Sequence, residues 1–217
     1  MIAVLDLGFG NTASVINMLN KAGVAACIVD NKESLALATG IILPGVGSFD
    51  TCMKAVKKDP ELLDLLEEKV LHQKAPFLGI CIGMHMLFES SAEGNEFGLG
   101  WIAGHVKRFS FDDDKIKIPH MSWSELKLQN NGDGLFEYGS KSRFYFVHSY
   151  YAQCENSEEL LATAQYGNKC FTAAVKRGNI YGVQFHPEKS HKFGLQLLTN
   201  FARVVDDYAQ NHSSSTC

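Results

Sequence analysis

The chain has 217 residues, of which 46% are hydrophobic, so it can bury the core of one enzyme-sized domain. Its 20 basic and 24 acidic residues give a net charge of −4, and the basic residues are scattered, which excludes the positively charged face typical of nucleic-acid binding. No apolar run approaches the length that spans a bilayer and no signal peptide is evident, so we expect a cytoplasmic protein without a membrane or nucleic-acid partner.

The cysteines and histidines do not have the spacing of a metal site. The six cysteines are dispersed and show no C-x-x-C pair, which argues against both a zinc site and a disulfide framework. No histidine has a second histidine four residues away, and the G-x-x-x-x-G-K-[ST] phosphate loop is absent. We therefore expect no metal ion and no cofactor.

The first part of the chain alternates between strand and helix signals. An apolar run at 2–7 predicts a buried strand, and a run of helical period follows it and ends at Gly23. Residues 26–30 and 40–45 predict two further strands.

The alternation continues to about residue 90. Asp59 and Pro60 begin a predicted helix whose Leu62, Leu66 and Val70 form one apolar stripe. A strand is predicted at 77–80, and a helix at 83–90. Such alternation is typical of a parallel sheet with helices on both faces.

The second half is rich in strand signals separated by short turns. A hairpin turn is predicted at 177–179, and a last helix at 192–208 precedes a polar tail, 209–217, that we expect to be disordered. The predicted strands are 105–109, 115–118, 143–151, 160–166, 172–178 and 179–185. The sequence thus predicts an α/β fold with a mostly parallel central sheet flanked by helices and antiparallel strands added in the second half, as a single domain over 1–208.

A cysteine stands between two glycines where a predicted strand meets a helix. In a turn of the G-x-nucleophile-x-G kind, Gly79 and Gly83 would remove side chains that collide across the bend and would expose the sulfur of Cys81 at the strand end. The start of a helix at this point favours a thiolate. Taken alone, the pattern also fits a buried cysteine with incidental glycines.

A cysteine nucleophile requires a base that a third group orients. His186 follows an apolar strand, and Glu188 lies two positions further on, so both side chains can leave the sheet edge on the same side. His186 is then the candidate base and Glu188 its orienting acid. The alternative is an ordinary surface turn at the end of a strand.

Acyl chemistry also requires hydrogen-bond donors for an oxyanion. The backbone amide of Ile82 is one candidate, and the glycine-rich turn after the strand at 40–45 offers those of Val46 and Gly47. This turn has a structural explanation as well, because glycine permits a tight connection between strand and helix.

Five separated motifs together carry a family resemblance. The segments PGVGSFD, GICIGM, IPHMSW, FYFVHSYY and YGVQFHPEKS occur in this order over most of the chain. They resemble the class I glutamine amidotransferases, and among them the glutaminase subunits of imidazole glycerol phosphate synthase. The resemblance implies that a Cys81-His186-Glu188 triad hydrolyses L-glutamine to glutamate and ammonia through a cysteine thioester.

The same resemblance implies further partners and contacts. Ammonia would pass through a tunnel into a (β/α)8-barrel synthase subunit of histidine biosynthesis, and residues 120–123 would lie near that partner. Gly47, Glu93, Ser149 and Tyr150 would hold the glutamine. Taken without the family, the aromatic strand that contains Tyr150 is more typical of core packing.

The chain departs from the family pattern at two places. His85 stands where relatives carry a glutamine that helps bind the substrate, and we expect it to hydrogen-bond the substrate in its place. Ser122 and Ser124 flank Trp123 in place of glycine and asparagine. These departures leave open a paralogue that supplies ammonia to an enzyme amidinating a surface-polysaccharide sugar.

Two other classes of function remain open from the sequence. The segment GFGNTA at 8–13 matches the dinucleotide-binding fingerprint, with Asp30 at the end of the next strand, and so favours an oxidoreductase. The fingerprint gives no role to Cys81, His186 or Glu188. A non-catalytic interaction subunit with the same fold is the other alternative, and His85 is the residue that favours it.

Overall fold

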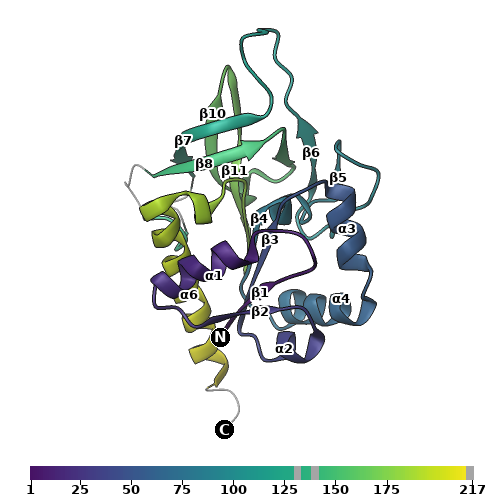
Figure 1. The fold of residues 1–217 in the computed structure, drawn as a ribbon, viewed down its shortest axis with the longest axis vertical. Coiled ribbons are helices and arrows are strands. Elements are labelled where there is room, and N and C mark those ends of the chain that lie inside the picture. The colour runs from purple at the N-terminus through teal and green to yellow at the C-terminus, as the bar shows by residue number, and fades with distance from the viewer. Residues whose placement is uncertain (130–132, 138–141, 214–217) are drawn as a thin grey trace.

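A computed structural model of the protein describes residues 1–129, 133–137 and 142–213. Within these ranges, nine strands form one mixed sheet and three short strands form a second. The large sheet runs through the molecule with helices on both sides (Figure 1). None of the helices in these ranges combines the length and the apolar character needed to cross a bilayer.

One half of the large sheet is parallel and contains the early strands. Its order is β2 (Ala26–Val29), β1 (Ile2–Leu5), β3 (Gly40–Gly45), β4 (Phe77–Cys81) and β12 (Ile180–Val183). All four neighbouring pairs are parallel. The carboxyl ends of these strands therefore meet at one edge of the sheet, which is where ligands bind in open α/β folds.

The other half of the large sheet is antiparallel and continues from β12. It contains β11 (Lys169–Arg177), β10 (Leu160–Tyr166), β7 (His120–Leu128) and β8 (Arg143–His148). The small sheet contains β5 (Ser90–Ser91), β6 (Gly104–Arg108) and β9 (Tyr150–Cys154). The expected α/β class, with antiparallel strands added in the second half, is confirmed.

Helices cover both faces of the parallel half (Figure 1). Helices α1 (Thr12–Lys21) and α6 (His191–Ser213) pack together on one side, and α2 (Lys32–Ala36), α3 (Phe49–Lys57) and α4 (Pro60–Glu67) lie on the other. The helical turns are η1 (Glu68–His72), α5 (Ile82–His85), η3 (Ser157–Glu159) and η4 (Pro187–Lys189). Asp59 caps α4 by accepting a hydrogen bond from the amide of Leu62, as its sequence predicts.

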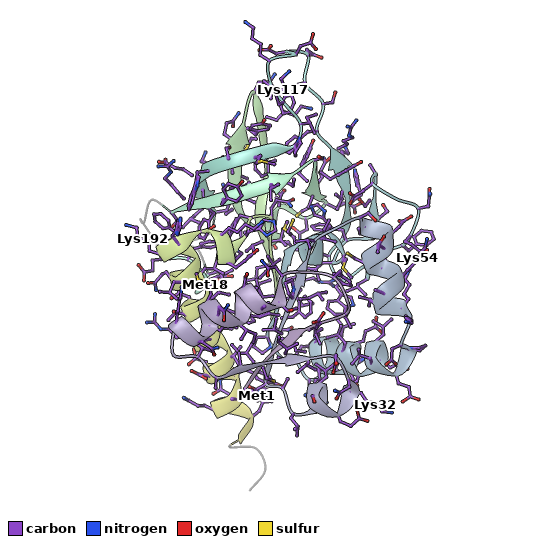
Figure 2. All side chains as sticks on the ribbon, in the orientation of Figure 1. Met1, Met18, Lys32, Lys54, Lys117 and Lys192 are labelled. Carbon is purple, nitrogen blue, oxygen red and sulfur yellow. The ribbon has the colours of Figure 1, made fainter. Side chains whose placement is uncertain are left out.

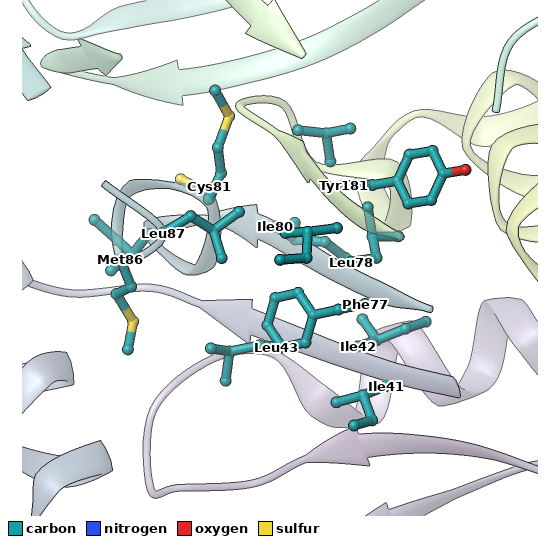
Figure 3. Packing of buried hydrophobic residues seen from close by; sticks show 14 of the residues in the cluster. Ile41, Ile42, Leu43, Phe77, Leu78, Ile80, Cys81, Met86, Leu87 and Tyr181 are labelled. Atoms are coloured by element: carbon teal, nitrogen blue, oxygen red, sulfur yellow. The ribbon is translucent and has the colours of Figure 1, made fainter. Parts of the chain in front are cut away.

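Apolar side chains of β3 and β4 form the centre of the core (Figure 3). Ile41, Ile42, Leu43, Phe77 and Leu78 are all fully buried. Lysines such as Lys32, Lys54, Lys117 and Lys192 lie at the periphery instead (Figure 2). Burial on both faces explains why β3 and β4 are nearly continuous apolar runs.

Four predicted elements differ from the structure in kind or extent. The expected strand at 115–118 is a turn, because Asp113 accepts hydrogen bonds from the backbone amides of Lys115 and Ile116. The strand expected at 143–151 is two strands, β8 and β9, which separate at Ser149 and belong to different sheets.

The helix expected at 83–90 is the single turn α5. It ends because the carbonyls of Met86 and Glu89 accept hydrogen bonds from Leu99 and Gly98 rather than continuing a helical ladder. At the carboxyl end of the chain, α6 continues past the expected limit at 208 to Ser213, and 214–217 lie outside the described residues.

Candidate active site

The bend at Cys81 joins the end of β4 to α5. Cys81 has φ +56° and ψ −109°, a positive-φ conformation that is strained for a residue with a side chain. A Cβ atom on Gly79 would lie 2.4 Å from the carbonyl oxygen of Gly83, and one on Gly83 would lie 2.0 Å from that of Leu43. The two glycines are therefore required by close backbone contacts, which confirms the predicted bend.

His186 and Glu188 follow β12, the strand beside β4. The Nδ1 atom of His186 lies 2.8 Å from Oε1 of Glu188, and both side chains are almost fully buried. The backbone of this segment is fixed to β8, because the backbone amide of His186 donates to the carbonyl of Tyr145. The hydroxyl of Ser190 donates in turn to the backbone carbonyl of His186. The ring and the carboxylate are thus held in one orientation.

The environment of His186 favours its charged form. Burial lowers the pKa of the ring, but interactions with Cys81 and Glu188 outweigh that effect and raise the pKa of His186 to about 10. At neutral pH the ring is therefore an imidazolium that can give up a proton. Cys81 and His186 also line the same cavity.

A cavity of about 400 Å³ lies at this edge of the sheet. Among the candidate residues from the sequence, it is lined by Val46, Gly47, Cys81, Ile82, His85, Glu93, Ser149, Tyr150 and His186. Glu188 is not one of the lining residues, but it accepts a hydrogen bond from His186, which is. The structure thus brings the separate sequence motifs together around one space.

The turn after β3 runs beside the bend at Cys81. A Cβ atom on Gly45 would lie 2.7 Å from the amide nitrogen of Gly83, so the two backbones are in direct contact. Gly47 has φ +119°, which glycine adopts without strain. Val46, Gly47 and Ile82 therefore lie along one wall of the cavity, next to the sulfur.

Glu93 enters the cavity from a loop that is fixed to the start of α3. Its Oε2 accepts a hydrogen bond from the amide of Phe49, and Asp50 accepts hydrogen bonds from the amides of Asn95 and Glu96. Gly94 packs so closely on Asp50 that a Cβ there would lie 1.8 Å from Oδ1. Burial is the main cause that raises the pKa of Glu93, and the amide of Phe49 opposes it.

A buried pair of histidines lies behind Ser149 and Tyr150. The carbonyl of Tyr150 can only accept, so His148 donates to it from Nδ1 at 2.8 Å, and its Nε2 accepts from Nδ1 of His120 at 3.1 Å. Burial lowers the pKa of His148 well below its ordinary value and that of His120 to about 4. Both rings are therefore neutral and support the wall of the cavity.

Ser122 and Ser124 complete this arrangement. Their hydroxyls lie 2.9 Å and 3.2 Å from Nε2 of His120, which is the acceptor that remains on that ring. Two of the departures from the family pattern thus satisfy a buried histidine.

His85 is 1% exposed and lines the cavity. Its Nε2 lies 2.7 Å from Oε1 of Gln184, and its Nδ1 is buried without a partner among the described atoms. Burial lowers the pKa of His85 to about 4, although the contact with Gln184 opposes this effect. A neutral ring that donates through Nε2 has an unprotonated Nδ1, so the nitrogen without a partner is an acceptor.

The glycine-rich turn at 8–13 has a packing explanation. A Cβ atom on Gly10 would lie 2.5 Å from the carbonyl oxygen of Pro44, so this glycine allows the turn to pack against the end of β3. Asp30 follows β2 at an exposed position, and neither residue lines the cavity. Among the described residues, no group of three or more histidine, cysteine or acidic side chains could hold a metal ion.

Sequence reasoning did not identify Pro119, Val147, Lys189 and Gln184 as part of this region. The first two are apolar wall residues and give no local signal. Gln184 is a fully buried polar residue in the otherwise apolar run YGVQF, and this exception could have indicated a polar partner in the core.

Comparisons with known proteins give the family and the fold of the chain. Residues 3–205 match the family model for class I glutamine amidotransferases. The chain is 50% identical over 206 residues to imidazole glycerol phosphate synthase subunit HisH 2 of Methanococcus maripaludis, with 94% of this chain and 99% of that protein covered. It is 47% identical to the subunit of the same name from Pseudomonas aeruginosa, with 94% and 100% covered. A solved glutamine amidotransferase structure superposes with a TM-score of 0.70 at 21% identity, over 96% of this chain and 98% of that one, and so shows the fold alone.

Proposed function

Since the chain belongs to the class I glutamine amidotransferases, we propose that it is the glutaminase subunit of a cytoplasmic synthase, which hydrolyses L-glutamine and delivers the ammonia to a partner subunit. The relatives are named as subunits of imidazole glycerol phosphate synthase. The proposed pathway is accordingly histidine biosynthesis.

The observation that supports the proposal is that Cys81 and His186 line one cavity and that Glu188 accepts a hydrogen bond from His186. The sulfur comes from the end of β4, and the imidazole and carboxylate come from the segment after β12. A nucleophile, a protonated imidazole and its orienting carboxylate are the set that acyl transfer requires. The cavity volume of about 400 Å³ suits a small substrate such as an amino acid.

The proposed reaction begins with attack of the Cys81 thiolate on the side-chain amide carbon of glutamine. The amides of Ile82 and of the Val46–Gly47 turn stabilise the negative oxygen that forms. His186 gives its proton to the departing nitrogen, so ammonia leaves and a γ-glutamyl thioester remains. His186 then takes a proton from water, which attacks the thioester and frees glutamate and the thiolate.

Glu93 supports recognition of an amino acid. Its carboxylate is the charge complement of the substrate α-ammonium, and the loop that carries it is held in place by Asp50 and the start of α3. Gly47, Ser149 and Tyr150 lie on the cavity wall and offer backbone groups for the remaining polar atoms of glutamine. His85 contributes an acceptor at Nδ1, and we propose that an N–H group of the substrate fills it.

The proposed partner is a (β/α)8-barrel synthase that covers the mouth of the cavity. Val46 is 43% exposed on the cavity wall, and Met121 is 60% exposed beside His120. Trp123 stacks on His191 with ring centroids 5.6 Å apart, and Lys189 is exposed on the cavity wall. Trp123 is half-buried, whereas Val46 and Met121 are exposed, and exposed apolar side chains next to a cavity are typical of a subunit interface.

The paralogue that serves a sugar-amidinating enzyme is the second candidate, and the site gives it little support. His85, Ser122 and Ser124 raised it, and the two serines have a partner within this chain in His120. The barrel protein that co-purifies with the chain from its source cell would decide which synthase it serves.

The test of the proposal measures glutamate release with and without the barrel synthase of the same organism. We expect Cys81→Ala to abolish glutamate release while the complex still uses an added ammonium salt. The matched control Cys170→Ala changes an exposed cysteine that does not line the cavity and should leave both reactions intact. Glutamine turnover that survives Cys81→Ala would contradict the nucleophile assignment.

A further inference from the structure

Three buried side chains form a polar chain that ends at the nucleophile. Nε2 of His85 lies 2.7 Å from Oε1 of Gln184, and Nε2 of Gln184 lies 3.9 Å from Sγ of Cys81. Gln184 is 0% exposed, His85 1% and Cys81 5%. The contacts join residues 99 and 103 positions apart in sequence, so the fold and not local spacing assembles the chain.

The chemistry of each group fixes the direction of these hydrogen bonds. A carboxamide has one accepting oxygen and one donating nitrogen, and a thiolate can only accept. With a thiolate at Cys81, the amide nitrogen of Gln184 must face the sulfur, and its oxygen must then face His85. His85 therefore donates from Nε2, and the reversed amide would direct an oxygen lone pair at the negative sulfur.

Gln184 and His85 are both buried, so the direction of their hydrogen bonds affects stability. Within the described residues, the sulfur of Cys81 is the hydrogen-bond partner of the side-chain nitrogen of Gln184. A buried donor that lost its partner would reduce the stability of the fold. The ring of His85 stays neutral at physiological pH, because burial lowers its pKa to about 4, and so it retains a single proton for Nε2. A carboxamide with no such neighbour could turn either way.

We propose that Gln184 stabilises the Cys81 thiolate by hydrogen bonding and that His85 is a positioning residue that fixes the orientation of the Gln184 amide. The inference deepens the proposed function and rests on Cys81 as its nucleophile. It gives a physical reason for histidine at position 85, since a ring nitrogen there supplies the donor that sets the amide.

The test measures the rate of Cys81 alkylation by iodoacetamide as a function of pH, without glutamine, with the modified residue identified by mass spectrometry. Gln184→Met keeps the length of the side chain but removes the donor, and His85→Met removes the group that orients it. Loss of one hydrogen bond to the charged sulfur should reduce the fraction of thiolate about tenfold. We therefore expect both variants to move the half-maximal pH of alkylation upward by about one unit. The titratable groups near the sulfur, His186, Glu188, Glu93 and Cys52, are unchanged in these variants. Burial raises the pKa of Cys52 to about 12, so this thiol stays neutral over most of the pH series.

Two further variants separate positioning from simple packing. His85→Gln retains an N–H that can donate to Gln184, so its half-maximal pH should return toward that of the wild type. Gln165→Met is the matched control, because Gln165 is exposed on β10 and donates to the carbonyl of Gly167. Circular dichroism verifies that each variant is folded before alkylation.

Each outcome has a defined meaning. A wild-type half-maximal pH in folded Gln184→Met would overturn the thiolate contact, and a shift in His85→Gln as large as in His85→Met would overturn the positioning role. Either result could occur while the wild type still released glutamate, in which case the proposed function would stand. A wild-type protein that forms no glutamate with its partner synthase would instead contradict the proposed function.

Discussion

Nδ1 of His186 lies 2.8 Å from Oε1 of Glu188, and both side chains are only 3% exposed. A shielded carboxylate keeps the imidazole oriented and favours its charged form. Glu188 is one of the groups that raise the pKa of His186, so removal of the Glu188 charge should lower that pKa.

Glu188→Gln should slow glutamate release by about 10²- to 10⁴-fold, the usual contribution of a positioned acid or base. The pKa of His186 should also fall, so the alkaline limb of the pH–rate profile should move to lower pH. Steady-state kinetics over a pH series would measure both effects. Glu158→Gln, at an exposed position in η3, is the control, and an unchanged alkaline limb in Glu188→Gln would contradict the assigned pairing.

Glu93→Gln should impair recognition of glutamine more than the chemical step. Loss of a charged hydrogen bond to the α-ammonium should raise KM by about 10- to 100-fold, with a smaller change in kcat. The variant should also discriminate less against Nα-acetylglutamine, which lacks the ammonium. Glu96→Gln, whose residue pairs with Lys57 near the surface, should keep the wild-type KM.

Gly83→Ala should destabilise the protein, because the new Cβ would lie 2.0 Å from the carbonyl oxygen of Leu43. Forced overpacking of this kind costs about 1–3 kcal/mol or more, and the bend at Cys81 should also distort. Urea unfolding and glutamate release would measure the two effects. Gly8→Ala is a suitable comparison, since Gly8 has φ +81° but no atom within 4 Å of the place that a methyl group would take, and its loss of activity should be smaller.

The neutral histidines predict how stability depends on pH. His85 and His120 have folded pKa values of about 4, and that of His148 is well below its ordinary value, whereas the unfolded rings take up a proton near pH 6.5. Below pH 6.5 the unfolded chain therefore binds more protons than the folded one. The free energy of unfolding should fall as the pH drops from 6.5 toward 4, on the order of 3 kcal/mol for His85.

Urea unfolding at several pH values in this range would test the sign, and His85→Gln should flatten the dependence. His186 acts in the opposite sense, because its folded pKa is raised to about 10. Its stabilising contribution is complete below pH 6.5 and is lost as the pH rises through 10. A free energy of unfolding that increased on acidification from pH 6.5 to pH 5 would contradict the neutral state of the buried rings.

The sequence predicts those parts of the site that are determined locally. The bend around Cys81 has no room for a side chain at Gly79 or Gly83. The sequence therefore shows glycine two positions before and after the cysteine, and this spacing predicts the bend. His186 and Glu188 can be paired because they are two positions apart at the end of a strand. The α/β class follows from the alternation of apolar runs in the first 90 residues.

Other features depend on contacts between remote segments and have no local signal. Glu93 is held by the amide of Phe49, 44 positions away, so the residues alone do not single it out without the family resemblance. The role of His85 depends on Gln184, and the sequence gives no indication that the two meet. The split between β8 and β9 likewise depends on the pairing of β9 with β6, because the run from 143 to 151 is uniformly strand-like.

The most direct test of Cys81 as an activated nucleophile is alkylation by the glutamine analogue 6-diazo-5-oxo-L-norleucine, followed by mass spectrometry of the intact and digested protein. We predict one adduct, on Cys81, which excess glutamine prevents and Cys81→Ala abolishes. Modification distributed over several of the six cysteines, unaffected by glutamine, would contradict an activated nucleophile at this site.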